Sequence, residues 1–184
     1  MISLRTIIAS VVTVGILTAT VLARGTEQHD ARAGAKPESA AKERLITAEA
    51  AVGKKVGSYT LIDQDGKQFQ LADFGGKPYM INFVYTNCSH ACPLLTSNLA
   101  TAIKNVKKEL GVKFRMVTVG FDTEQDTPGA MKQFGSRFVE RFDGWTFATA
   151  DRATMDALTS NFGFYYQKEE SGGFAHMNMV SLVD

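Results

Sequence analysis

Residues 79–93 read YMINFVYTNCSHACP, and this stretch decides the fold prediction for the whole chain. Tyr79–Tyr85 is mostly apolar, aromatic or β-branched without clean alternation, which predicts a strand buried on both faces. From Pro93 to Leu110 the apolar residues recur at helical spacing, which predicts a helix. Between these two segments stand Cys88 and Cys92, the only cysteines in 184 residues. A thiol pair at a strand-to-helix turn indicates chemistry rather than packing.

The segments on either side of this stretch alternate between strand and helix patterns. Upstream, Asp65-Gly66 is a strong hairpin signal between predicted strands at Tyr59–Asp63 and Lys67–Leu71. Downstream, the patterns predict a strand at Phe114–Phe121, a helix from Pro128 to about Glu140 capped by Thr127, a strand at Trp145–Ala150, a helix from Asp151 to near Gly163, and two terminal strands at Phe164–Tyr166 and Phe174–Val183. Strands that alternate with helices pair in parallel. We therefore predict an α/β, thioredoxin-like fold, with a central mixed β-sheet flanked by helices and an N-terminal β-hairpin.

The first 51 residues differ in composition from the rest of the chain. An uncharged, largely apolar run at 6–22 follows Arg5, so residues 1–23 are predicted to be a signal peptide or a membrane anchor. Residues 24–51 are predicted to be a linker in which His29 has no role. The thioredoxin-like domain is predicted at 52–184, and its end directly after a strand favours truncation at the C-terminus. The domain is expected on the periplasmic side of the membrane, anchored by residues 6–22 if they are uncleaved.

The bulk composition excludes two classes of protein. The chain is 45% hydrophobic and 21% charged, which is ordinary for a globular protein and too apolar for a disordered one. Its formal net charge is +1 and no basic block stands out. A nucleic-acid partner is therefore not expected.

The spacing of Cys88 and Cys92 allows three kinds of chemistry. Residues four apart lie on one face of a helix, so the pair could form a redox-active disulfide or share a metal ion. Pro93 is expected to push Cys92 out of helical geometry. The helix N-terminus favours the thiolate, which helps nucleophilic attack and metal binding alike. A purely structural disulfide is the third possibility, but it would close so short a loop that it would stabilise the fold little.

A third metal-binding side chain near the two cysteines would distinguish a metal site from a redox-active cysteine pair. Soft thiolates suit Cu(I) and imidazole suits copper in either oxidation state, whereas a structural zinc site needs four protein ligands that the chain does not obviously supply. His176 precedes a predicted strand and, in a thioredoxin-like fold, would face the cysteine turn; a structural role for it stays open. His90 is predicted to be exposed and to tune the thiols. Met177 and Met179 alternate along a strand and are predicted to pack in the core.

Three motifs together resemble the SCO/SenC family, the thioredoxin-like copper-binding proteins of cytochrome c oxidase assembly. They are residues 85–93 around the cysteines, residues 122–128 after the second parallel strand, and His176 ahead of a strand that ends the chain. The resemblance covers about 52–184. Two positions depart from the family pattern, since Ser89 stands where proline is usual and Ala175 where an aspartate is common.

This resemblance implies a copper site made by Cys88, Cys92 and His176, with Asp122 at an acidic position near it. It implies delivery of Cu(I) or Cu(II) to a copper-accepting oxidase subunit or another copper protein, and a thiol reductant as a second partner. The alternative function is a thiol-disulfide oxidoreductase acting on exported protein cysteines, in which Cys88 and Cys92 form the redox-active pair and His176 is structural. A non-catalytic binding module remains only if both thiols are inert.

Overall fold

The computed structural model describes residues 37–74, 76–170 and 172–184. The predicted signal or anchor at 6–22 and the residue His29 lie outside this range. Among the described helices, none combines the length and the apolar character needed to cross a membrane. The predicted linker is helical in part, because α1 spans Pro37–Glu49. The boundary at residue 52 stays a prediction.

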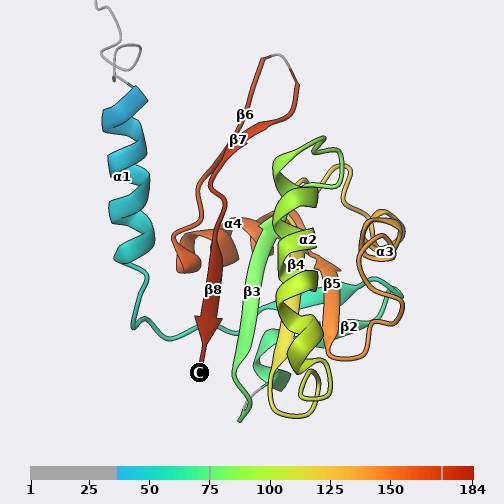
Figure 1. Ribbon diagram of the computed structural model, residues 1–184. Helices are drawn as coiled ribbons and strands as arrows, with labels where there is room; N and C mark the ends of the chain where they lie inside the picture. Colours follow the sequence, from blue (N-terminus) through green and yellow to red (C-terminus); the bar gives the residue numbers. More distant parts are fainter. Residues whose placement is uncertain (1–36, 75, 171) are drawn as a thin grey trace, which may run out of the picture. The chain divides into compact units, whose positions relative to one another are not determined.

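A central six-stranded sheet organises the fold (Figure 1). The strands lie in the order β2-β1-β5-β4-β3-β8. Neighbours among β3, β4 and β5 pair in parallel, and all other pairs are antiparallel. Their bounds are β1 Thr60–Asp63, β2 Gln68–Gln70, β3 Tyr79–Val84, β4 Arg115–Gly120, β5 Trp145–Thr149 and β8 Val180–Val183. The predicted hairpin, interior strand and mixed thioredoxin-like sheet are confirmed.

The interior strand β3 is apolar apart from Asn82 because both faces of the sheet are covered. Ile81 and Phe83 belong to a core shared with α4 (Arg152–Phe162). Val84 belongs to a second core shared with α2 (Ala91–Ile103) and α3 (Pro128–Gly135). Figure 1 shows α2 running along the strands, in front of β4 and beside β3, and residues of all three share one core. The cysteine turn therefore joins a strand in the middle of the sheet to a helix packed over it.

Helix α2 spans Ala91–Ile103 and differs from the prediction at both ends. It begins before Pro93, so the expectation that proline would displace Cys92 from helical geometry is wrong. The first backbone N–H groups of a helix have no partner within it, so a proline in the first turn removes no hydrogen bond. At the other end, a short 3₁₀ segment, η2 Lys104–Val106, replaces the last predicted turn.

The remaining helices carry the predicted caps. Helix α3 spans Pro128–Gly135, and Thr127 accepts a hydrogen bond from the Ala130 N–H, although the helix ends well before Glu140. Helix α4 spans Arg152–Phe162 and is capped by the side chain of Asp151. A short 3₁₀ segment, η1 Leu71–Phe74, follows β2.

The predicted terminal strand at Phe174–Val183 is wrong as a single element. Its first part is β7 Phe174–His176, which pairs with β6 Tyr166–Lys168 in a separate antiparallel ribbon. Its second part is β8, which joins the main sheet beside β3. Between them the Met177 N–H bonds to the Tyr165 carbonyl, as the chain passes from ribbon to sheet. His176 consequently ends β7, and, as expected, it also lies ahead of the strand β8 that closes the sequence.

Gly120 at the end of β4 and Gly129 in α3 give a matched test of packing. A Cβ added at Gly120 would lie 2.5 Å from the Met131 sulfur and 2.7 Å from the Asp126 Cβ. We expect Gly120→Ala to lower the free energy of unfolding by about 1–3 kcal/mol in urea denaturation, because the crowded atoms are buried. At Gly129 the nearest atom to such a Cβ is 4.0 Å away, so Gly129→Ala should be neutral or stabilising by less than about 1 kcal/mol. Equal losses in both variants would contradict this assignment.

Candidate metal centre

The two cysteines lie in and just after the loop that connects β3 to α2. Cys88 is 8% exposed and Cys92 is 1% exposed, and both are free thiols. The Cys92 backbone N–H donates to the Cys88 sulfur at 3.3 Å. The first turn of α2 thus directs an unpaired helix N–H at one of the sulfurs, as helix N-termini do for anions.

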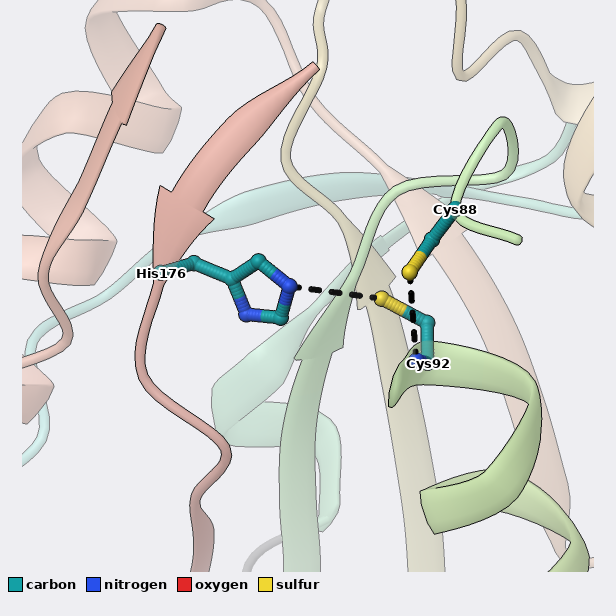
Figure 2. Close-up of side chains that lie close together, drawn as sticks. All are labelled: Cys88, Cys92 and His176. Atoms are coloured by element: carbon teal, nitrogen blue, oxygen red, sulfur yellow. Dashed lines mark hydrogen bonds between the residues drawn. The ribbon is translucent and has the colours of Figure 1, made fainter. Parts of the chain in front are cut away.

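His176 brings an imidazole to the same place from the end of β7. Its Nε2 atom lies 3.8 Å from the Cys92 sulfur (Figure 2). The nearest ligand atoms of Cys88, Cys92 and His176 all lie within 4.8 Å of one another. The structure therefore brings together the three residues that the sequence singled out, across more than 80 positions of chain.

A backbone carbonyl orients the imidazole. The Nδ1 atom of His176 lies 2.9 Å from the Met177 carbonyl oxygen. A carbonyl can only accept, so Nδ1 carries the proton and Nε2 turns its lone pair toward the cysteines. The ring also packs against Tyr85 and Phe121, each with its centroid 5.6 Å away. The Met177 carbonyl thus orients the imidazole, a role that an aspartate could play at position 175 but Ala175 cannot.

The pKa values of the two thiols are shifted in opposite directions. Burial raises the pKa of Cys88, but hydrogen bonds from the backbone of Cys92 and His90, with the Cys92 and Tyr85 side chains, outweigh burial and lower that pKa below its usual value. At Cys92, burial raises the pKa well above the usual value, and the neighbouring Cys88 sulfur raises it further. Cys88 is therefore the thiol that ionises first.

A buried carboxylate that the sequence did not single out holds the cysteine loop in place. Asp126 is 2% exposed and accepts hydrogen bonds from the Thr86 N–H at 2.8 Å and the Thr86 hydroxyl at 2.7 Å. Its other oxygen accepts from the Asp122 N–H at 2.9 Å. Asp126 itself does not cap α3, because the neighbouring Thr127 does. The sequence carried no signal for this role, because an aspartate in a loop is ordinarily solvated and its partner Thr86 lies 40 positions away.

The other residues considered from sequence lie outside the group of three. His90 is exposed, and its ring bonds to the Ser89 hydroxyl, while its backbone is what contacts Cys88. The Asp122 side chain lies in a separate hollow of about 340 Å³, which also contains Arg152 and Lys168. Met177 and Met179 pack against the core, as predicted.

The donor set fits a soft metal ion. A metal bound roughly 2.0–2.3 Å from each nitrogen and sulfur holds its ligand atoms about 3.5–4 Å apart. The observed separations need only a small contraction to reach that range. Two thiolates and one imidazole without a carboxylate favour copper over calcium or magnesium. The same closeness of the sulfurs keeps a disulfide available.

Comparison with known proteins gives one consistent answer. A family model described as SCO1/SenC matches residues 47–184. The SCO1 protein homolog of Bacillus subtilis is 32% identical over 95 residues, which cover 52% of this chain and 49% of that protein. This chain spans about half the length of the curated relatives it matches first.

Solved structures agree with this result. The copper-bound ScoI of Bradyrhizobium japonicum is 26% identical, with a TM-score of 0.64 over 71% of this chain and 83% of that one. A SCO1/SenC family lipoprotein of Bacillus anthracis is 28% identical, with a TM-score of 0.66 over 72% and 80%. BsSco, a member of the Sco family of cytochrome c oxidase assembly proteins in which a disulfide switch was identified, is 27% identical. Its TM-score is 0.62 over 72% of this chain and 78% of that one.

The difference in thiol acidity predicts a difference in reactivity. In the reduced, metal-free chain near neutral pH, iodoacetamide should modify Cys88 at least about tenfold faster than Cys92, because the thiolate is the nucleophile. Mass spectrometry of partly alkylated protein measures both rates. Cys88→Ser and Cys92→Ser provide the matched controls, and equal rates at the two remaining thiols would refute the assignment.

Asp126 predicts a pH dependence of stability. Burial raises its pKa to about 6, and the nearby Asp122 charge adds to this, although hydrogen bonds from Thr86 and Asp122 oppose it. Between about pH 4 and pH 6 the folded chain keeps a proton that the unfolded chain releases, so the free energy of unfolding falls as pH rises, by about 3 kcal/mol in total.

The variant Asp126→Asn should lack this fall, as urea denaturation from pH 4 to pH 8 would measure. Asp143→Asn removes a carboxylate whose side chain is 72% exposed and should keep the wild-type slope. Identical slopes for wild type and Asp126→Asn would show that the buried carboxylate does not titrate in this window.

Proposed function

The chain belongs to the SCO1/SenC family, and we propose that it is a copper chaperone that carries one copper ion on Cys88, Cys92 and His176. The observation that carries the proposal is the convergence of two cysteine sulfurs and one lone pair of an oriented imidazole within 4.8 Å. Copper-bound relatives with this fold support the choice of metal. Copper here is cargo rather than a resident cofactor.

Three ligands suit a protein that must release its metal. A site with an open coordination position can accept a ligand from a partner before it loses one of its own, which a closed four-ligand site cannot do. Cys88 supplies the thiolate that forms first, and Cys92 ionises as the metal binds. His176 completes the set from a different structural unit, the β6–β7 ribbon.

The proposed client is the copper-accepting subunit of cytochrome c oxidase. Support comes from a similar Sco protein described as a cytochrome c oxidase assembly protein. The proposed location is the periplasmic side of a membrane, where residues 6–22 act as an export signal or anchor. A lipoprotein among the similar structures agrees with a membrane-attached protein.

The second candidate function is thiol-disulfide exchange with exported protein cysteines. One observation favours it specifically: an acidic thiol at Cys88 stands beside a buried thiol at Cys92. In this chemistry the Cys88 thiolate attacks a partner disulfide, and Cys92 then displaces the partner from the mixed disulfide. The resulting Cys88–Cys92 disulfide would need a thiol reductant as partner.

Copper titration of single variants tests the proposal. Cys88→Ala, Cys92→Ala and His176→Ala should each weaken Cu(I) or Cu(II) binding by at least about tenfold, because even outer-shell partners of a metal site contribute that much. His90→Ala is the matched control, since this exposed histidine is outside the group of three, and it should bind normally. The affinity should fall as pH falls, because the thiols must lose protons to bind.

The same variants separate the two candidate functions. If His176→Ala kept full copper affinity while the wild-type chain reduced a model disulfide rapidly, the chaperone assignment would fail. The oxidoreductase would then be the better description. If the wild-type chain bound copper tightly and all three alanine variants lost that binding, the result would support the chaperone assignment.

A further inference from the structure

His176 lies on a ribbon that stands apart from the main sheet. Among the described strands, β6 and β7 pair only with each other, and Figure 1 shows them projecting beyond the end of β3. A two-stranded ribbon is at best marginally stable by itself in water. The position of the imidazole relative to the two cysteines therefore depends on contacts between this ribbon and the rest of the domain.

The residue opposite His176 in the ribbon is Tyr166. The two residues are paired in register across β6 and β7, so their side chains lie on the same face of the ribbon. Both rings pack against Phe121, whose ring centroid is 4.7 Å from that of Tyr166 and 5.6 Å from that of His176. A displacement of Tyr166 would therefore displace the imidazole as well.

The hydroxyl of Tyr166 connects the ribbon to α4. It donates a hydrogen bond to the Asp156 carboxylate at 3.1 Å, and the Arg152 Nε atom, one turn earlier on α4, lies 3.0 Å from the same carboxylate. A hydrogen bond to an ionised carboxylate is roughly twice as strong as one between neutral groups. Since Met155 and Leu158 on either side of Asp156 are buried, α4 itself is fixed in the core.

The other polar contact of β6 on this side is weaker. A hollow of about 340 Å³ is lined by residues of β6, α4 and the loop after β4, so packing there is incomplete. Lys168 forms an ion pair with Glu124 at 2.9 Å, but the two side chains are 63% and 66% exposed, and such surface pairs contribute little. The partly buried Tyr166 therefore supplies the stronger polar contact between the ribbon and the domain.

We propose that Tyr166 and Asp156 are positioning residues of the metal centre, and that their hydrogen bond holds the His176 imidazole at the cysteine sulfurs. This inference rests on the proposed function, which makes His176 a ligand. The cysteines are placed separately, by the loop after β3 and the first turn of α2. Loss of the hydrogen bond should therefore weaken the contribution of the imidazole and leave that of the sulfurs unchanged.

Amide hydrogen exchange of the reduced, metal-free full chain tests this contact without copper. Tyr166→Phe keeps the ring and removes the hydroxyl, so exchange in β6 and β7 should become about three- to tenfold faster. Exchange in β3 and β4 should change less than about twofold. Tyr59→Phe is the matched control, because the Tyr59 hydroxyl also bonds to α4, at the Ala157 carbonyl 3.4 Å away, but Tyr59 lies just before β1. This variant should leave exchange in the ribbon unchanged.

A double-mutant cycle tests whether the hydrogen bond acts through the imidazole. Tyr166→Phe should weaken copper binding by about three- to tenfold in the wild-type background, but by less than about twofold in the His176→Ala background. Asp156→Ala should match Tyr166→Phe. Asp156→Asn should keep most of the affinity, because its amide oxygen can still accept the hydrogen bond.

Three results would overturn the assignment. They are unchanged exchange in β6 and β7 of Tyr166→Phe, an equal increase in Tyr59→Phe, or equal losses of copper affinity in the two backgrounds. Equal losses would mean that the hydroxyl acts on the cysteines or on the whole fold. Failure of the proposed function would appear separately, as a wild-type chain that binds no copper, and hydrogen exchange would then still decide whether the hydroxyl holds the ribbon in place.

Discussion

The carboxylate of Asp126 is the contact on which the metal centre depends. One oxygen holds Thr86 in the loop after β3, and the other holds the Asp122 backbone after β4. The two loops leave the same edge of the sheet because β3 and β4 are parallel. Gly120 leaves the space that the carboxylate occupies. A buried acid thus fixes the backbone from which Cys88 projects, without contributing a ligand.

Local patterns predicted most of the fold. The Asp65-Gly66 turn, the capping residues Thr127 and Asp151, and the apolar run that became β3 act within a few residues, so each was readable from the sequence. The same holds for Cys88 and Cys92, which share one turn. His176 could be proposed as their partner only because the fold class implied which loop faces the turn.

What escaped the sequence depends on contacts between distant segments. The break between β7 and β8 follows from two different pairing partners, β6 and β3, and a run of residues without a turn signal does not reveal such a change. The role of Asp126 could not be predicted because its hydrogen bonds to Thr86 cross 40 positions of chain. The early start of α2 depends on Pro93 falling in the first turn, where a proline costs no hydrogen bond.

The division of the ligands between two β-structures has a thermodynamic consequence. The sulfurs belong to the junction of the main sheet with α2, whereas the imidazole belongs to a ribbon that has its own two-stranded pairing. Any ion held by all three side chains must therefore bind the docked ribbon more tightly than an undocked one. By thermodynamic linkage, metal binding favours ribbon docking by the same free energy by which ribbon docking favours metal binding. An ion bound by all three side chains would thus act as a reversible cross-link between the main sheet and the ribbon.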